Sequence, residues 1–423
     1  MKAQRFTAIF FVSVLAVMIF LVFAGIVMRA AEKLTGSPEN TDPNVVHIDW
    51  DKLYPFESGG TYADEPKLSL FAFMKEKITN YTSEKMAGRF TLVEGAKTYE
   101  ELIGWNMTTQ GYNPVLKLND GYLSDITESL DITENAEAVK GLDEFCRGMG
   151  IEYAYISLPA KICQSEDTYI SGFLDFSNQN TDRLLDALGR AGVRYYDLRK
   201  TLHAEGIDHH GAFFRTDHHW KPETGLWAAK HVLEFLRDDY GWDVEPEILD
   251  PERFEHKVYP EWFLGSQGKK LSLMRTQPDD FTMLYPKFRT LIHYEAPNDR
   301  VNTSGDFSVT YYMKSVERKD YYGLNPYGAY KHADQPLDRI HNLLNHDGRK
   351  ILIIHGSMSN CVIPLIALGV EYTDAIDLRH FTGSLRSYIK ATKPDMVIVS
   401  YYAKTPGRSS KSQRPNNRMY DFR

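Results

Sequence analysis

The chain has 423 residues, ordinary fractions of charged and apolar residues, and a formal net charge of −8. This length is enough for one large domain or two modest ones with a complete core, and the acidic balance argues against nucleic acid as the main partner. The cysteines, Cys146, Cys163 and Cys361, have no metal-ligand spacing, so we expect buried thiols with at most one bridge, and no disulfide framework.

The N-terminus carries a long uncharged run. Residues 6–28 contain no charged side chain, which is enough to span a bilayer as one helix. Lys2 and Arg5 precede the run, so we expect a signal anchor with residues 1–5 in the cytoplasm. A cleaved signal peptide is the alternative, although the run is long for one and no clear cleavage site closes it. The sequence therefore predicts a single-pass protein of the cell membrane, with its bulk outside the cytoplasm.

Residues 29–47 are interpreted as a linker and residues 48–403 as the extracytoplasmic domain. Hydrophobic periodicity in that domain predicts helices that alternate with apolar strands, and this order is typical of an α/β fold with a mostly parallel sheet covered on both faces. The predicted helices are Glu134–Met149, Asn180–Ala191 and Pro222–Asp238, and the predicted strands are Ile151–Leu158, Val193–Leu198, Lys350–Ile354, Tyr372–Leu378 and Asp395–Tyr402.

Two further segments lack this regular pattern. Residues 245–335 are rich in aromatic and turn residues, and we expect them to form an elaboration beside the sheet. Residues 404–423 carry six basic residues and one acidic residue, with prolines and serines between them. This composition predicts a basic, disordered tail.

The stretch from Phe213 to Trp220 contains the clearest candidates for catalytic side chains in the sequence. Asp217 stands two residues before His219, so in an extended segment it can orient that imidazole as a general base. The hydroxyl is expected from Ser357, which follows the Lys350–Ile354 strand and Gly356 and precedes an apolar, helix-compatible segment. These residues form a candidate Ser-His-Asp triad.

Two other interpretations of the histidines stay open. Asp208-His209-His210 and Asp217-His218-His219 repeat one unit, which allows a metal site, but no further ligand at helical spacing completes a coordination sphere. The histidines can also be structural, capping loops beside a tryptophan packed on a helix. We expect no metal and no organic cofactor.

Five short motifs follow one another along the chain: Asp175-Phe-Ser-Asn178, Thr216-Asp-His-His-Trp220, Gly265-Ser266, Asn325-Pro-Tyr-Gly328 and Ile376-Asp-Leu-Arg379. This ordered series resembles the bacterial DHHW family, which is similar to the AlgX/AlgJ alginate O-acetyltransferases and to the SGNH-type hydrolases. The resemblance covers roughly residues 112–402.

The resemblance implies a three-layer α/β/α sandwich with a permuted motif order, in which the Asp-x-His segment precedes the serine. It also implies acetyl transfer to an exported or cell-wall polysaccharide, or ester hydrolysis from one, with a membrane-bound O-acyltransferase as the acyl-donor partner. The catalytic residues would be Ser357, His219 and Asp217. Candidates for oxyanion or substrate contacts are Asn360, Gly265 and Ser266, and His218, Trp220 and Arg379 would support the site from behind.

One departure from the family pattern concerns the nucleophile. The family serine follows an aspartate, whereas Gly356 precedes Ser357 here. Glycine permits a strained turn, so an active site is compatible with the change. Loss of the aspartate is equally compatible with a non-catalytic, polysaccharide-binding or assembly component that keeps a degenerate site.

Overall fold

The computed structural model describes residues 107–108, 115–162, 174–271, 273, 275–407 and 415–423. Contacts divide the chain into Met1–Arg89 and Phe90–Arg423, and all of these residues lie in the second unit. The expected cytoplasmic segment (1–5), membrane span (6–28) and linker (29–47) lie outside them. In the part of the chain that is described, no helix has both the length and the hydropathy needed to cross a membrane.

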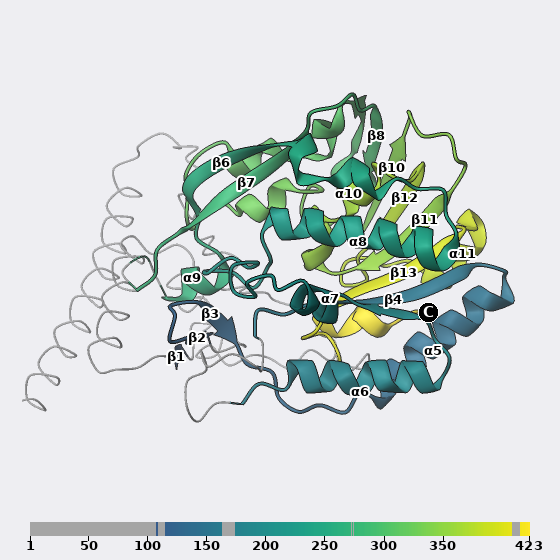
Figure 1. Cartoon of the computed structure of the whole chain (residues 1–423), viewed down its shortest axis with the longest axis horizontal. Coiled ribbons are helices and arrows are strands. Elements are labelled where there is room, and N and C mark those ends of the chain that lie inside the picture. The colour runs from purple at the N-terminus through teal and green to yellow at the C-terminus, as the bar shows by residue number, and fades with distance from the viewer. Residues whose placement is uncertain (1–106, 109–114, 163–173, 272, 274, 408–414) are drawn as a thin grey trace, which may run out of the picture. The chain divides into compact units, whose positions relative to one another are not determined.

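An eight-stranded sheet forms the centre of the described residues, in the order β5-β4-β13-β11-β12-β10-β8-β9 (Figure 1). The strands from β5 to β12 are parallel, and β10, β8 and β9 continue the sheet antiparallel. The parallel part confirms the predicted α/β sheet, and the whole sheet is mixed. In chain order its strands are β4 (Glu152–Leu158), β5 (Tyr195–Asp197), β8 (Ile292–Ala296), β9 (Val301–Gly305), β10 (Leu337–Asn342), β11 (Lys350–His355), β12 (Tyr372–Ile376) and β13 (Met396–Tyr402).

Helices cover both faces of this sheet because its central strands are apolar on both sides. Along β11, Ile351 and Ile353 face one core cluster, and Leu352 and Ile354 face the other. The first cluster is completed by α7 (Leu198–Ala204), α8 (Pro222–Tyr240) and α10 (Ile363–Ile366). The second is completed by α5 (Thr133–Gly148), α6 (Ser177–Arg190) and α11 (Leu385–Thr392). The three helices predicted from periodicity correspond to α5, α6 and α8.

The aromatic-rich segment does not lie wholly beside the sheet. Its strands β6 (Phe254–Phe263) and β7 (Asp279–Pro286) pair as a separate ribbon, with α9 (Ser266–Leu271) between them. Its strands β8 and β9, in contrast, extend the main sheet, which corrects the expectation. In β8 buried and half-buried residues alternate, as in a strand with one covered face, and this short pattern was hidden among turn residues.

The C-terminal segment also departs from its prediction. Residues 415–423 contain the 3-10 helix η8 (Pro415–Tyr420), and Met419, Tyr420 and Phe422 are at most 4% exposed within the second core cluster. Lys404 is buried and forms an ion pair with Asp125. The prediction of a disordered tail is therefore wrong for residues 404–407 and 415–423. The prediction followed the basic composition of the segment and did not take account of Met419, Tyr420 and Phe422, which pack in the core.

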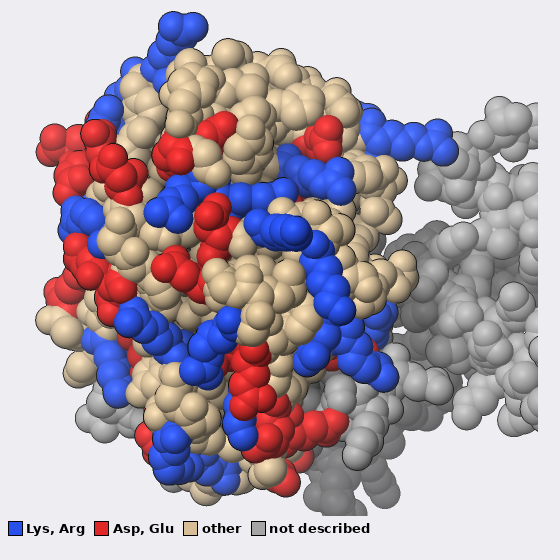
Figure 2. Space-filling view, turned by 90° about the vertical axis from the view of Figure 1, so that its right-hand side faces the viewer, with Lys and Arg blue, Asp and Glu red and all other residues tan. Residues whose placement is uncertain are grey.

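The remaining described elements are short. A small antiparallel sheet contains β1 (Met107–Thr108), β2 (Val115–Lys117) and β3 (Leu123–Asp125). The other 3-10 turns are η1 (Pro246–Leu249), η2 (Pro251–Arg253), η3 (Pro297–Asp299), η4 (Phe307–Thr310), η5 (Met313–Val316), η6 (Pro326–Ala329) and η7 (Ser357–Cys361). The face drawn in Figure 2 carries basic and acidic side chains interspersed with one another.

Candidate active site

The candidate nucleophile lies where β11 leaves the sheet. The turn η7 begins directly at Ser357, and the short helix α10 follows, so the apolar segment forms less helix than its sequence allows. Gly356 has φ −117° and ψ −179°, an extended conformation that any residue adopts, so the expected strained turn is not present. A side chain is instead restricted there by space, because a Cβ atom on residue 356 would lie 2.9 Å from Cε of Met419.

The candidate base and acid lie on a loop that contacts hold in place at its base and at its tip. At its base Phe213 and Trp220 form an antiparallel bridge, directly before α8 begins at Pro222. At its tip the carboxylate of Asp279 accepts hydrogen bonds from the backbone N–H of Arg215 and from the N–H and hydroxyl of Thr216, at 2.6–2.8 Å. These contacts fix the loop, whose backbone bends from Arg215 to His219 instead of running extended as the sequence suggested.

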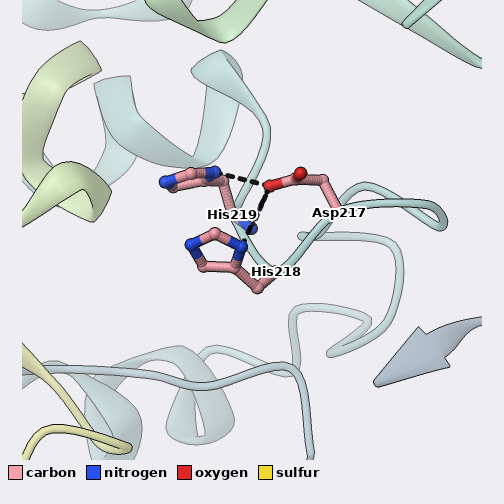
Figure 3. Close-up of side chains that lie close together, drawn as sticks. All are labelled: Asp217, His218 and His219. Atoms are coloured by element: carbon pink, nitrogen blue, oxygen red, sulfur yellow. Dashed lines mark hydrogen bonds and ion pairs between the residues drawn. The ribbon is translucent and has the colours of Figure 1, made fainter. Parts of the chain in front are cut away.

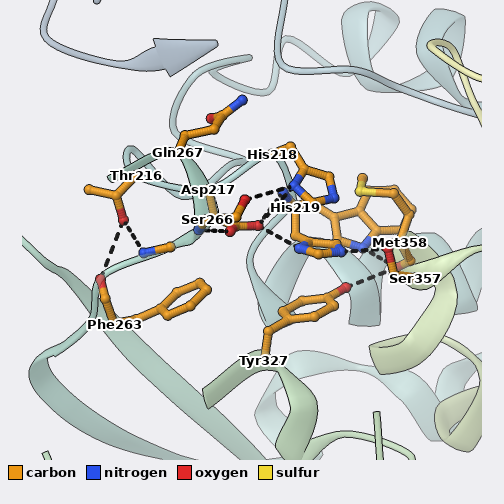
Figure 4. A network of polar contacts seen from close by, with 12 residues as sticks. Thr216, Asp217, His218, His219, Phe263, Ser266, Gln267, Tyr327, Ser357 and Met358 are labelled. Atoms are coloured by element: carbon orange, nitrogen blue, oxygen red, sulfur yellow. Dashed lines mark hydrogen bonds and ion pairs between the residues drawn. The ribbon is translucent and has the colours of Figure 1, made fainter. Parts of the chain in front are cut away.

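The structure brings the three predicted triad residues together (Figure 4). Oγ of Ser357 lies 2.8 Å from Nε2 of His219, although the two residues are 138 positions apart. On the other side of the ring, Nδ1 of His219 lies 2.5 Å from Oδ1 of Asp217. Burial alone would raise the pKa of Asp217, but the neighbouring imidazoles of His218 and His219 and the hydrogen bonds hold it well below its usual range. Asp217 therefore stays an ionised acceptor that can orient His219 as a base.

His218 lies beside His219, and both imidazoles face the carboxylate of Asp217 (Figure 3). Its Nδ1 is 3.4 Å from Oδ1 of Asp217 and 3.3 Å from Oγ of Ser266, and its ring centroid is 3.9 Å from that of His219. Burial, and to a smaller extent electrostatic repulsion between the two imidazoles when both are protonated, lowers the pKa of His218 to about 4. A neutral second imidazole is therefore held next to the base at neutral pH.

Two aromatic side chains support the turn that carries Ser357 through hydrogen bonds. The indole N–H of Trp220 and the hydroxyl of Tyr327 both donate to the backbone carbonyl of Met358, at 2.8 and 2.9 Å. Trp220 therefore contacts the turn that carries Ser357. Tyr327 belongs to the Asn-Pro-Tyr-Gly motif, but its contact with the turn was not foreseen, because nothing in the sequence relates that motif to residue 358.

Gly265 and Ser266 are placed differently from their prediction. The N–H of Gly265 donates to Oγ1 of Thr216 at 2.9 Å, and the N–H of Ser266 donates to Oδ2 of Asp217 at 2.6 Å. Both N–H groups are thus occupied, and neither is left for an oxyanion. A Cβ atom on residue 265 would lie 2.3 Å from Cβ of Asp217, so glycine is needed for this close approach. These residues fix the acid of the triad.

Asn360 and Arg379 meet through a residue that the sequence did not single out. The amide Nδ2 of Asn360 donates to Oδ1 of Asp334 at 2.8 Å. Oδ2 of the same carboxylate lies 3.1 Å from Nη2 of Arg379, whose Nε also donates to Asp377. Asp334 is an isolated acid in a loop, and no spacing or periodicity in the sequence marks it.

In the described part of the chain, only one of the two Asp-His-His units belongs to a group that could hold a metal ion. Asp217, His218 and His219 each offer a ligand atom within 4.8 Å of the others, and Asp334, Asp377 and His380 form a second such group. The Asp208-His209-His210 repeat forms no such group among the described residues. In the first group both ring nitrogens of His219 already contact Asp217 and Ser357, which is the arrangement of a triad.

Comparison with known proteins agrees with this geometry. Residues 118–261 match the family model described as "SGNH hydrolase-like domain, acetyltransferase AlgX". The matched segment contains Asp217 and His219 and ends before Ser357, so the position of the serine is known here from the structure. No curated protein sequence matches the chain.

Solved structures share the fold at low sequence identity. PatB1 of Bacillus cereus, in a structure with a sulfonyl adduct, has a TM-score of 0.60 and 16% identity, over 74% of this chain and 100% of that one. A DHHW family protein from Eubacterium siraeum has a TM-score of 0.55 and 16% identity, over 75% of this chain and 97% of that one. The match over residues 118–261 confirms the resemblance of the motifs to this family, and the solved structures share the fold.

Proposed function

We propose that this protein is a membrane-anchored, extracytoplasmic O-acetyltransferase that acts on an exported or cell-wall polysaccharide through Ser357, His219 and Asp217. The observation that carries the proposal is the hydrogen bond from Ser357 to a histidine whose other nitrogen is held by a buried carboxylate. That the transferred group is acetyl is inferred from the family match. We propose, as part of the same family assignment, that the domain is a three-layer α/β/α sandwich in which the Asp-x-His segment precedes the serine.

In the first half-reaction His219 acts as general base. Its Nε2 accepts the proton of Ser357 while Oγ attacks the carbonyl carbon of the acetyl donor. The tetrahedral intermediate then collapses, and the leaving group departs with the proton that His219 returns. Ionised Asp217 stabilises the imidazolium that forms between these two steps. The product is an acetyl ester on Ser357.

In the second half-reaction a sugar hydroxyl gives its proton to His219 and attacks the acetyl-serine. Collapse of that intermediate releases the acetylated sugar and returns the proton to Oγ of Ser357. The negative oxygen of both intermediates needs donors. The N–H of Ser357 opens η7, where the first N–H groups of a helical turn have no partner inside the turn, and Asn360 lies in the same turn.

Water is the competing acceptor. Ser357 is half-buried rather than enclosed, which keeps a carbohydrate esterase as the second candidate. The uncharged run at residues 6–28 supports anchoring, and we propose a membrane-bound O-acyltransferase as donor partner and the polysaccharide as acceptor. Protease added to intact protoplasts should then digest the domain, and protection of the domain would contradict this orientation.

A sulfonyl fluoride tests the nucleophile without knowledge of the natural donor. Wild-type protein should gain one sulfonyl group, located at Ser357 by peptide mass spectrometry, and should hydrolyse a small acetyl ester. Ser357→Ala should prevent both reactions, with turnover reduced by several orders of magnitude. Ser359→Ala is the matched control, because that serine lies in the same turn and its hydroxyl pairs with Ser400 instead.

Two results would overturn the assignment. If Ser357→Ala retains labelling and turnover, the nucleophile is wrong. If wild-type protein shows neither reaction and still binds polysaccharide, the site is degenerate and the protein is a binding or assembly component. Transfer to a sugar that exceeds release of free acetate would separate the transferase from the esterase.

A further inference from the structure

We propose that Asp334 is a positioning residue, which orients the amide of Asn360 so that Asn360 donates a hydrogen bond to the oxyanion formed at Ser357. The inference rests on the proposed function and adds a residue that neither the motifs nor the triad includes. Asp334 is not proposed to touch the substrate. It acts through Asn360.

The first argument concerns where Asn360 stands. The turn η7 is a 3-10 helix, in which side chains three residues apart are eclipsed. Ser357 and Asn360 are three residues apart, so both side chains leave the turn on the same side. Asn360 is 2% exposed, which removes water as an alternative partner for its amide. A buried donor beside the nucleophile is where an oxyanion contact has the most effect.

The second argument concerns which end of the amide faces the nucleophile. An asparagine presents either N–H groups or a carbonyl oxygen, and its neighbours decide which. Burial alone would raise the pKa of Asp334, but Arg379 and the hydrogen bond from Asn360 lower it to about 2. An ionised carboxylate only accepts hydrogen bonds, so the nitrogen of Asn360 must face it. One N–H is used by Asp334, and the hydrogen bonds of the described residues include no partner for the second N–H or for the buried Oδ1 of Asn360. We assign the second N–H to the oxyanion.

The carboxylate is itself held in place. Nη2 of Arg379 lies 3.1 Å from Oδ2 of Asp334, while its Nε donates to both carboxylate oxygens of Asp377, at 2.9 and 3.0 Å. Asp377 is fully buried, and Arg379 follows the carboxyl end of β12. A series of contacts therefore connects a rigid strand end to the nucleophile turn, from Asp377 through Arg379 and Asp334 to Asn360.

The backbone that delivers Asp334 is strained. The three residues before it, Lys331, His332 and Ala333, have φ of 53°, 49° and 65°. Left-handed conformations are costly for residues with side chains and usually occur singly. The run is maintained by a fully buried ion pair between Lys331 and Asp338. Such strain persists where surrounding contacts over-determine it, often at functional sites.

Replacement of the carboxylate by an amide gives a sharp test. In Asp334→Asn, the guanidinium of Arg379 should attract the new carbonyl oxygen, which turns the new NH2 group toward Asn360. Asn360 would then rotate to offer its oxygen, and its N–H would leave the oxyanion. A change that preserves size should therefore reduce turnover, whereas a purely structural role for Asp334 predicts little effect.

The experiment compares wild type, Asp334→Asn, Asn360→Ala and the double variant, with kcat and KM for a small acetyl ester and the rate of sulfonyl labelling. Removal of one oxyanion donor typically lowers kcat by about 10²–10³-fold, and we expect this for Asn360→Ala. Asp334→Asn should lower kcat by about 10–100-fold with KM changed less than about 3-fold. The double variant should fall no more than about 3-fold below Asn360→Ala, because both changes remove one interaction.

Asp299→Asn is the matched control. It makes the same charge change near the same loop, where Asp299 accepts a hydrogen bond from Gln335 and does not contact Asn360. We expect wild-type kcat and labelling. The reciprocal variant Asp334→Asn with Asn360→Asp allows a hydrogen bond between the two positions but supplies no N–H to the nucleophile. It should unfold near the wild-type temperature and remain as inactive as Asn360→Ala.

The results separate this inference from the proposed function. Full activity in folded Asp334→Asn, losses that multiply in the double variant, or activity in the reciprocal variant would each overturn the role of Asp334 while Ser357 remains the nucleophile. If Asp334→Asn fails to fold, the reciprocal variant decides. If wild-type protein is neither active nor labelled, the proposed function fails and the inference falls with it.

Discussion

The ring of Tyr327 lies flat against the imidazole of His219, with centroids 4.0 Å apart and planes 17° apart. The hydroxyl of the same tyrosine donates to the carbonyl of Met358, one residue after Ser357. One side chain thus contacts the base and supports the turn that carries the nucleophile. The distance between His219 and Ser357 therefore depends on Tyr327 as well as on the loop around Asp217.

Tyr327→Phe separates these two contributions. The phenyl ring keeps the contact with His219, and one hydrogen bond to Met358 is lost, which should cost about 1 kcal/mol of stability. Because Trp220 still donates to that carbonyl, we expect kcat to fall less than about 10-fold. Tyr327→Ala should cost roughly 3–5 kcal/mol, by analogy with phenylalanine, and should lower kcat further. Denaturant unfolding and ester hydrolysis measure both effects, and equal losses of kcat in the two variants would contradict the role of the ring.

The sequence predicted the parts of the fold where hydrophobic periodicity is strong. The helices α5, α6 and α8 and the strands β4, β11 and β13 agree with their predicted segments to within a few residues at each end. Strand β8, which lies between β10 and the edge strand β9, was missed because a strand with one covered face alternates, and five residues of alternation are not distinguished from a turn-rich background. The packing of η8 was missed because Met419 and Phe422 form long-range contacts that leave no local pattern.

The residues of the site also divide into those that the sequence predicts and those that it does not. Asp217, His219 and Ser357 follow from chemistry and spacing, since an acid two residues from a histidine and a serine after a buried strand suggest roles. The supports Asp279 and Asp334 do not, because each acts through contacts between segments distant in sequence. Gly265 was noticed, but the reason for it is the Cβ of Asp217 rather than an oxyanion.

The depressed pKa of His218 predicts how stability depends on pH. In the unfolded chain this histidine takes up a proton near pH 6.5, and in the folded protein only near pH 4. Between these values the unfolded state binds more protons, so stability rises with pH and is lost as pH falls from 6.5 toward 4. The slope from one such group is at most about 1.4 kcal/mol per pH unit.

His218→Gln should therefore flatten the loss of stability in this window. Buried His355, whose pKa burial lowers to about 3, gives the same background in both proteins. Thermal unfolding from pH 4 to 7 measures the difference between wild type and variant. A variant that loses stability as steeply as wild type would show that His218 is not held neutral.

The group of Asp217, His218 and His219 predicts the outcome of metal removal. Because both nitrogens of His219 are engaged by Asp217 and Ser357, we expect purified protein to hold no stoichiometric zinc and to keep its activity and unfolding temperature in a chelator. Elemental analysis and ester hydrolysis before and after chelation test this. About one equivalent of metal, lost together with stability and absent from His219→Ala, would favour the metal site.

The contact between Gly356 and Met419 predicts what side chains the nucleophile turn accepts. A Cβ on residue 356 meets Cε of Met419 at 2.9 Å, and that atom is the flexible end of a long side chain. Gly356→Ala should therefore cost less than about 1.5 kcal/mol, because Met419 can move aside. Gly356→Asp adds a polar group to an apolar cluster at a site with no space, so we expect a loss of at least about 1–3 kcal/mol.

A double variant shows whether Met419 causes this loss. Met419→Ala alone should cost roughly 2–5 kcal/mol by opening a cavity. In its presence Gly356→Asp should cost less than it does in wild type, because the cavity admits the carboxylate and its water. Met283→Ala is the matched control, since Met283 is equally buried but belongs to the other core cluster, and there the two costs should add. Denaturant unfolding gives the free energies of wild type, the three single variants and the two double variants, and additivity with Met419→Ala would mean that something other than this methionine limits residue 356.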